Sequence, residues 1–169
     1  MKNIFYYQTD IGRIGIAEED NQITNLFFEN DSCPDVRTGS NEDVASKDYY
    51  LNETDILKEA SSQLYEYLLG KRQTFYLPLA PMGTVFMKNV WSCLGDISYG
   101  KTKSYKEIAQ AVGNAKACRA VGHANNKNPI PIFIPCHRVI GANGKLIGYR
   151  GGLQTKIQLL ELEKQYGND

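Results

Sequence analysis

Long apolar runs are missing from this sequence of 169 residues. No stretch approaches the roughly 18 consecutive apolar residues that a membrane span needs. Met1-Lys2-Asn3 leads directly into a segment that alternates apolar and polar residues, and no signal-peptide core follows it. These absences predict a protein without a membrane segment that stays where it is made, in the cytoplasm, or in the nucleus of a eukaryotic cell.

Closely paired cysteines are missing as well. The four cysteines, Cys33, Cys93, Cys118 and Cys136, form no C-x-x-C pair and no dense framework. This usage is typical of reduced thiols in a reducing compartment and does not indicate a disulfide scaffold. Cys136 is therefore expected to be free to react.

The net charge is zero, but the charges are unevenly distributed. Residues 1–82 carry seven basic and fourteen acidic side chains, a balance of −7, whereas residues 83–156 carry eleven basic and two acidic ones, a balance of +9. Such an asymmetry suggests that one part of the chain meets a polyanion. Charge alone leaves a solvated basic face as an equal alternative to nucleic-acid binding.

The first half of the chain predicts a small α+β domain over residues 1–80. Alternating segments at 4–9, 12–18 and 22–29 are typical of a β-meander. Residues 30–52 are polar and acidic and predict a mobile loop. Apolar residues at helical spacing follow between Glu53 and Gly70, a further strand is predicted over 74–77, and the prolines near 78–81 suggest a linker.

The second half, residues 83–169, predicts a mainly helical domain. Thr84 can cap a first helix, Ser104 can start a second one that ends at Gly113, and a third begins near Ala115. Two short helices joined by a glycine-containing turn are a helix-turn-helix candidate, although any two adjacent amphipathic helices give this pattern. A final amphipathic helix follows Gly152.

The stretch Ile134-Pro135-Cys136-His137-Arg138 is the best candidate for chemistry, because a base beside a cysteine can produce the nucleophilic thiolate. By itself a free cysteine is more often a small buried apolar residue. Residues 128–139 resemble the active-site signature of the O6-alkylguanine-DNA alkyltransferases, also called methylated-DNA-protein-cysteine methyltransferases. The resemblance continues over about residues 83–163, through motifs such as Ile97-Ser98-Tyr99-Gly100, Arg119-Ala120-Val121-Gly122 and Gly151-Gly152-Leu153.

The resemblance implies an α+β protein in which a ribonuclease H-like domain precedes a helical domain with a helix-turn-helix and a reactive-cysteine loop. It implies DNA repair by irreversible, stoichiometric transfer of the alkyl group from O6-alkylguanine, and from O4-alkylthymine, in double-stranded DNA. The protein would act as a monomer without a cofactor. No metal is expected, since the first half has Cys33 but no histidine for the zinc site that some relatives carry.

The resemblance also assigns roles to individual residues. Cys136 is the nucleophile and alkyl acceptor, His137 the base acting through a water, and Glu163 the residue that orients His137. Tyr105 would hydrogen-bond the leaving purine and help to rotate the base out of the duplex, and Arg119 would enter the stack in its place. The other assigned positions are Cys118, Ala120, Gly122, Lys116 and Ser104 for DNA binding, Tyr149, Arg150, Gly151 and Val139 for the substrate pocket, and Asn128 as a structural residue.

Three positions depart from the pattern, and three other functions stay open. Cys118 and His123 stand where smaller residues are common, and Arg150 stands where some relatives have serine, so only its backbone N–H can be carried over.

The alternatives are a lesion-recognition protein of the alkyltransferase-like class, which lacks the reactive cysteine, an alkylation-sensing transcription regulator, which needs a further zinc-bearing domain, and a Cys-His hydrolase, which needs an oxyanion site.

Overall fold

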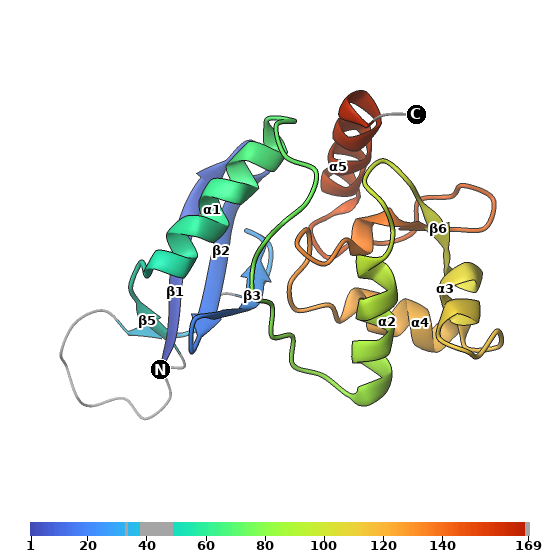
Figure 1. Cartoon of the computed structure of the whole chain (residues 1–169), viewed down its shortest axis with the longest axis horizontal. Helices are drawn as coiled ribbons and strands as arrows, with labels where there is room; N and C mark the ends of the chain where they lie inside the picture. The colour runs from blue at the N-terminus through green and yellow to red at the C-terminus, as the bar shows by residue number, and fades with distance from the viewer. Residues whose placement is uncertain (33, 38–48, 168–169) are drawn as a thin grey trace. The chain divides into compact units, whose positions relative to one another are not determined.

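The computed structural model describes residues 1–32, 34–37 and 49–167, so Cys33 and most of the predicted acidic loop lie outside the described residues. The chain forms two compact units, Met1–Ala80 and Pro81–Asp169 (Figure 1). Strands and helices occur in both units, which confirms the α+β class. Among the described residues, no helix is both long and apolar enough to cross a membrane.

The first unit is built on a five-stranded sheet with the order β3-β2-β1-β5-β4. The predicted meander is confirmed: β1 (Lys2–Thr9), β2 (Gly12–Glu19) and β3 (Gln22–Phe27) pair in antiparallel fashion. The prediction of a loop throughout 30–52 is wrong, because β4 (Val36–Arg37) and β5 (Tyr49–Leu51) extend the sheet with parallel pairing. Tyr49 supplies the reason, since its buried ring packs with Ile4 and Ala17.

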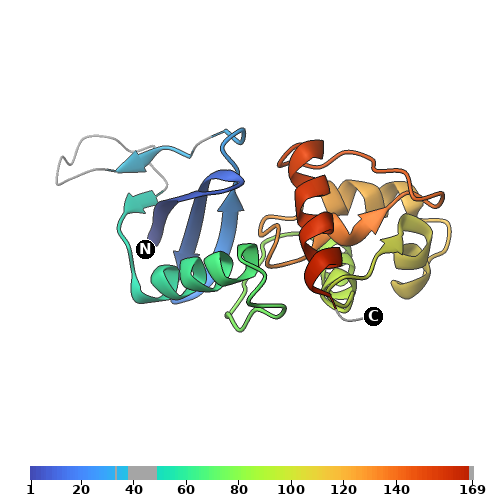
Figure 2. The ribbon, with the colours of Figure 1, turned by 90° about the horizontal axis from the view of Figure 1, so that it is seen from above.

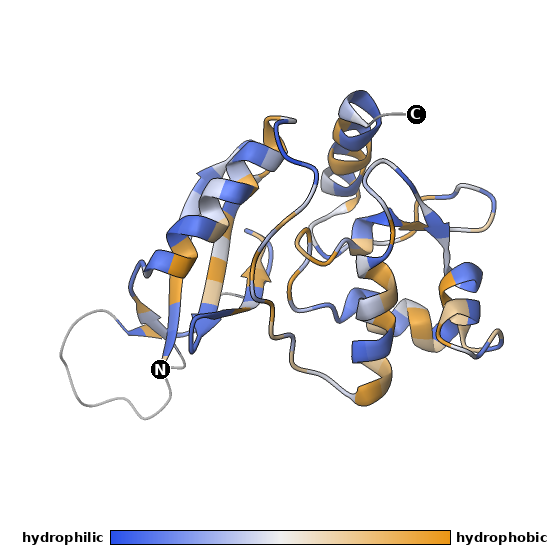
Figure 3. Ribbon diagram, viewed as in Figure 1, coloured by the Kyte–Doolittle hydropathy of each residue, from blue (hydrophilic) through white to orange (hydrophobic). Residues whose placement is uncertain are grey.

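Helix α1 (Asp55–Leu68) lies along this sheet (Figure 2). It alternates hydrophilic and hydrophobic residues along its length (Figure 3), and it buries Leu57, Ala60, Leu64 and Tyr67. The strand predicted over 74–77 is absent. Gln63 of α1 instead holds this segment through its side-chain amide, which accepts from the N–H of Tyr76 at 2.9 Å and donates to the carbonyl of Tyr76 at 3.2 Å.

In the second unit, helices α2 (Val85–Gly95), α3 (Tyr105–Ala111) and α4 (Cys118–Asn126) pack together. Thr84 caps α2 as predicted, by accepting a hydrogen bond from the N–H of Met87. The indole of Trp91 donates to the carbonyl of Ala124 at 2.8 Å, which ties α2 to α4. The third helix starts at Cys118, later than the predicted position near Ala115.

Ser104 and Glu107 form a reciprocal capping box at the start of α3. The Ser104 hydroxyl accepts from the N–H of Glu107 at 3.1 Å, and the Glu107 carboxylate accepts from the N–H of Ser104 at 2.7 Å. The Ser104→Ala variant is therefore expected to lose about 1 kcal/mol of unfolding free energy. Urea unfolding at neutral pH measures this loss, and a variant as stable as the wild type would contradict the capping role.

A short parallel pair of strands and two further helices complete the second unit. Strand β6 (Lys103–Ser104) pairs with β7 (Val139–Ile140), which directly follows the short 3₁₀ helix η1 (Cys136–Arg138). Helix α5 (Leu153–Tyr166) packs against η1 and buries Lys156, Leu159 and Glu163. Two of these three buried side chains, Lys156 and Glu163, are ionisable.

Candidate active site

The loop that precedes Cys136 is fixed by two buried asparagines, Asn125 in the last turn of α4 and Asn128 just after the helix. Asn128 donates to the carbonyl of Ile134 at 2.9 Å and accepts from the N–H of Ile130 at 3.0 Å. Asn125 donates to the carbonyl of Cys136 at 3.3 Å. Within this loop Ile132 has φ +73°, a strained conformation for a β-branched residue, so the surrounding contacts must hold the backbone in place. The loop thus gives Cys136 a defined position.

Cys136 is buried, with 4% of its surface exposed. Burial raises the pKa of its thiol, while a hydrogen bond with Asn128 and the positive charges of Arg150 and Lys156 oppose that rise. A buried thiol of this kind needs a base before it can attack, since only the thiolate is a strong nucleophile. The residues that follow Cys136 in sequence supply a candidate.

His137 and Glu163 form a buried pair behind the thiol. The Nε2 atom of His137 lies 2.8 Å from Oε1 of Glu163. Burial lowers the pKa of His137 despite the opposing effect of Glu163, so the imidazole is neutral at physiological pH. Because the ionised Glu163 accepts the hydrogen bond, Nε2 carries the ring proton and Nδ1 holds the lone pair. The pair therefore provides a neutral base in a fixed tautomer.

Arg138 completes this arrangement, and sequence reasoning assigned it no role. Its guanidinium donates to both carboxylate oxygens of Glu163, at 2.8 Å from Nη2 and 2.9 Å from Nε, and Nη1 donates to the carbonyl of Ile97 at 2.6 Å. Burial alone would raise the pKa of Glu163, but the hydrogen bonds from His137 and Arg138 lower it to about 2. Glu163 is therefore ionised at physiological pH.

Gly100 also contacts this carboxylate. Its N–H donates to Oε2 of Glu163 at 3.3 Å, and its backbone has φ +76°. A Cβ at this position would lie 3.3 Å from the carbonyl oxygen of Glu163, so a side chain would meet both strain and crowding. The motif Ile97-Ser98-Tyr99-Gly100 thus contacts this group of residues twice: the carbonyl of Ile97 accepts from Arg138, and the N–H of Gly100 donates to Glu163.

Lys156 is a second ionisable residue that sequence reasoning missed. It is completely buried on α5, where its ammonium donates to the carbonyls of Val139 at 2.7 Å and Ile147 at 3.2 Å. Burial lowers the pKa of Lys156, and the nearby Cys136 opposes that effect. Lys156 therefore links Val139, in the strand after the reactive cysteine, to the segment that contains Ile147. It also places a cation near the sulfur.

A cavity of about 300 Å³ lies between α3, α4 and the segment around Gly148. Among the predicted site residues, its walls include Tyr105, Cys118, Arg119 and Gly122, and they also contain residues that were not predicted: Asn126, Ile147 and Gly148. Tyr105 is half-buried, and the pKa of its phenol is raised by burial and, to a smaller extent, by the charge of Cys136. The cavity thus brings together residues from three separate segments.

The remaining predicted residues lie around this cavity or apart from it. Lys116, just before α4, and Ala120, in its first turn, are exposed, and so are the basic residues Arg119, His123 and Lys127 along this helix and at its end. The Ser104 hydroxyl is engaged in the capping box, and Val139 is buried in β7. Tyr149, Arg150 and Gly151 form a turn before α5 and do not line the cavity. Within the described residues, no group of His, Cys, Asp and Glu side chains is arranged to hold a metal ion.

Comparison with known proteins gives matches over both units. The family model "6-O-methylguanine DNA methyltransferase, ribonuclease-like domain" matches residues 4–81, and "6-O-methylguanine DNA methyltransferase, DNA binding domain" matches residues 85–165. The constitutive methylated-DNA--protein-cysteine methyltransferase of Bacillus subtilis is 46% identical over 158 residues, which cover 93% of this chain and 92% of the relative.

Two further relatives extend these matches. The methylated-DNA--protein-cysteine methyltransferase of Methanosarcina acetivorans is 54% identical over 116 residues, covering 69% of this chain and 74% of the relative. The crystal structure of Mycobacterium tuberculosis OGT in complex with DNA has a TM-score of 0.83 and 38% identity, covering 97% of this chain and 94% of that one.

Proposed function

The chain belongs to the 6-O-methylguanine DNA methyltransferase family, and from this premise we propose that it repairs DNA by transferring an alkyl group from O6 of guanine to the sulfur of Cys136. The observation that carries the proposal is the buried Cys136 followed in sequence by His137, which is hydrogen-bonded to Glu163, in a unit that also holds a cavity bordered by Tyr105 and Arg119. The chain acts as a monomer and takes O4-alkylthymine as a second substrate.

In the proposed reaction, His137 accepts the thiol proton of Cys136 through a water, and Glu163 stabilises the imidazolium that forms. The thiolate then attacks the alkyl carbon. A carbon–sulfur bond forms as the carbon–oxygen bond breaks, and the electron pair stays on guanine. Tyr105 hydrogen-bonds a ring nitrogen of guanine and so stabilises the negative charge that develops there. The thioether product has no good leaving group, so each molecule reacts once.

The target atom is inside the duplex, so the base must leave the stack, which costs a few kcal/mol. In our proposal α4 enters the minor groove, and the side chain of Arg119 fills the space that the base vacates. Small residues such as Gly122 permit this approach in a groove only about 6 Å wide. A Cβ on Gly122 would lie 3.9 Å from the ring of Tyr105, so the helix is also close to the residue that receives the base.

Transfer of labelled methyl groups from duplex DNA containing O6-methylguanine tests this function. One equivalent of label per protein, with no further transfer on longer incubation, is the expected result. More than one equivalent per protein would contradict the single-use reaction, and steady-state release of an acyl product from an ester or amide would indicate a Cys-His hydrolase instead. Tight DNA binding without any transfer would indicate a lesion-recognition protein.

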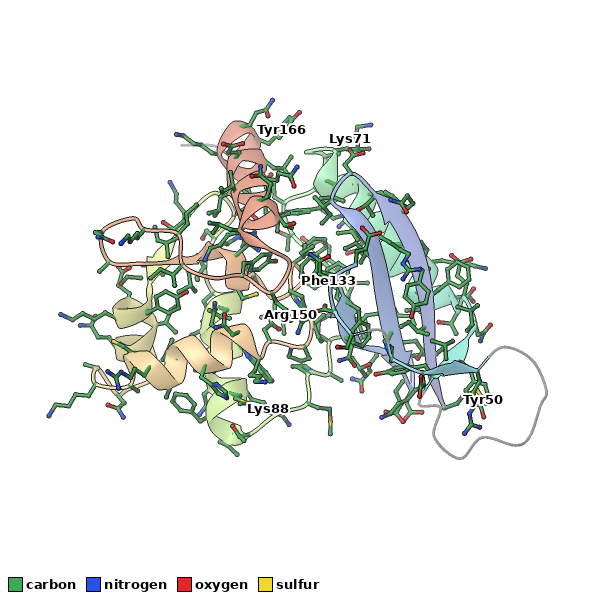
Figure 4. The ribbon with its side chains drawn as sticks, turned by 180° about the vertical axis from the view of Figure 1, so that it is seen from behind. Tyr50, Lys71, Lys88, Phe133, Arg150 and Tyr166 are labelled. Atoms are coloured by element: carbon green, nitrogen blue, oxygen red, sulfur yellow. The ribbon has the colours of Figure 1, made fainter. Side chains whose placement is uncertain are left out.

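The Tyr105→Phe variant should transfer alkyl groups more slowly, by a factor on the order of 100, because the departing guanine loses a hydrogen-bond donor. Single-turnover kinetics at saturating DNA measure this effect, and the affinity for DNA should change little. Tyr166→Phe, near the end of α5, is the matched control and should react at the wild-type rate (Figure 4). Equal rates for Tyr105→Phe and the wild type would show that the Tyr105 hydroxyl takes no part in the transfer step.

A further inference from the structure

Arg150 links the turn before α5 to the end of the α4 segment through its side chain. Its Nη1 atom donates to the carbonyl oxygen of Asn128 at 2.9 Å. The turn itself is closed by a hydrogen bond from the N–H of Gly152 to the carbonyl of Tyr149 at 2.9 Å. Figure 4 labels Arg150 on the chain that leads into α5.

A glycine lies on either side of the central residues of this turn. Gly148 and Gly152 have φ +32° and φ +92°, and an added Cβ would meet nothing within 4 Å at either residue. Glycine suits these φ values, and crowding would not exclude a larger residue at either position. Glycine also resists changes in φ and ψ less than any other residue. A side-chain contact from within the turn is then the natural means of holding it, and Arg150 provides one.

Asn128, the acceptor, also holds the reactive loop. Its side-chain amide binds the backbone of Ile130 and Ile134, and its hydrogen bond to Cys136 favours the thiolate. The main-chain carbonyl of the same residue accepts from Arg150. One buried residue therefore connects the loop that carries the sulfur to the turn beside the pocket.

The guanidinium of Arg150 is one of several titratable or charged groups that surround Cys136. Tyr105 approaches from α3, His137 and Arg138 belong to η1, and Lys156 and Glu163 extend from α5. Arg138 is neutralised by Glu163. Lys156 and Arg150 donate to uncharged carbonyl oxygens, so these contacts do not cancel their charges. Both cations lower the pKa of the Cys136 thiol.

We propose that Arg150 is a positioning residue for alkyl transfer, which fixes the 149–152 turn against Asn128 and keeps a positive charge near the sulfur of Cys136. The proposal rests on the proposed function for its effect on transfer, but not for its effect on the thiol. It gives a role to a side chain at a position where the family resemblance supplied only a backbone N–H.

Three substitutions separate the two parts of this role. Arg150→Gln keeps a donor for the Asn128 carbonyl and removes the charge, Arg150→Lys keeps the charge, and Arg150→Ala removes both. Lys145→Gln is the matched control, because it removes a charge from an exposed residue earlier in the same connection between β7 and α5. Urea unfolding of all four variants identifies any that fail to fold.

The first readout is the rate of Cys136 modification by iodoacetamide as a function of pH, measured without DNA in protein whose other three cysteines, Cys33, Cys93 and Cys118, are replaced by serine. Arg150→Gln should shift the apparent pKa of the thiol upward by about one unit, since an opposite charge that favoured the thiolate is gone. Arg150→Lys and Lys145→Gln should keep the wild-type titration. An unshifted titration for Arg150→Gln would overturn the electrostatic part.

The second readout is single-turnover transfer from DNA carrying methyl or benzyl groups. Arg150→Gln should be slowed by up to about tenfold at pH 7 for both groups, and the loss should shrink as the pH rises and the thiol ionises. Arg150→Ala should in addition change the methyl-to-benzyl rate ratio, because its turn is no longer held. A loss independent of pH, or an unchanged ratio in Arg150→Ala, would contradict the proposal. If wild-type protein transfers nothing, the proposed function fails, while the iodoacetamide titration still tests Arg150.

Discussion

The Arg138→Met variant is expected to lose about 3–5 kcal/mol of unfolding free energy at pH 7, because it leaves the Glu163 carboxylate buried without its cation. Glu163 is 1% exposed and receives three hydrogen bonds from Arg138. Urea unfolding measures the loss. The control is Arg72→Met, which breaks the more exposed ion pair between Arg72 and Glu66 and should cost less than about 1 kcal/mol.

The pH dependence of this loss follows from the depressed pKa of Glu163. A carboxyl group whose pKa is about 2 in the folded protein, against an ordinary value of 4.5, contributes its full stabilisation above pH 4.5. That contribution disappears as the pH falls toward 2 and the carboxylate is protonated. The difference between wild type and Arg138→Met should therefore narrow over this range. A difference that is small at pH 7, or constant with pH, would contradict the ionic role of the pair.

A double variant separates stability from chemistry at this site. Arg138→Met combined with Glu163→Met replaces both charges by apolar side chains, and it should recover most of the stability that the single variant loses. It should nevertheless transfer alkyl groups slowly, because His137 has lost the acceptor that fixes its tautomer. Rapid transfer by a stable double variant would show that Glu163 does not orient His137.

The Arg119→Ala variant should lose on the order of 100-fold in the rate of transfer from duplex DNA. Arg119 is exposed on α4 beside the cavity, and without it nothing replaces the flipped base in the stack. Unstacking costs a few kcal/mol, and about 1.4 kcal/mol corresponds to a factor of ten. Free O6-benzylguanine needs no flipping, so its reaction with Arg119→Ala should proceed at nearly the wild-type rate.

Lys127→Ala provides the matched control for Arg119→Ala, since Lys127 is another exposed cation, at the end of α4. This variant should bind DNA more weakly and with a less steep dependence on salt, but it should react at the wild-type rate once DNA is saturating. If Arg119→Ala behaves in the same way as this control, Arg119 is a phosphate contact and does not take part in base flipping.

The sequence was sufficient for those elements whose signals are local. The β-meander follows from strict alternation, and the starts of α2 and α3 follow from Thr84 and Ser104, whose caps involve only neighbouring residues. The short strands β4 and β5 could not be found, because two or three residues carry too little periodicity. Residues 74–77 have strand composition, but Gln63 of α1 binds their backbone instead.

The active-site residues that could be predicted from the sequence are likewise those with a local signal or a family motif. Cys136 and His137 were found because they are adjacent in a motif, and Glu163 came from the family resemblance. Arg138 and Lys156 were missed because a charged residue is normally assigned to the solvent, and their partners are distant in sequence. The pocket residue Asn126 was missed because nothing in an amphipathic pattern distinguishes it from a solvated helix residue.

The central claim is that Cys136 itself receives and keeps the alkyl group. Intact-mass measurement followed by peptide mapping tests it most directly, after incubation of the protein with duplex DNA containing O6-methylguanine. We predict an added mass of one methyl group, located on Cys136, and no added mass in the folded Cys136→Ala variant. A methyl group on another residue, or an unmodified protein beside demethylated DNA, would contradict the claim.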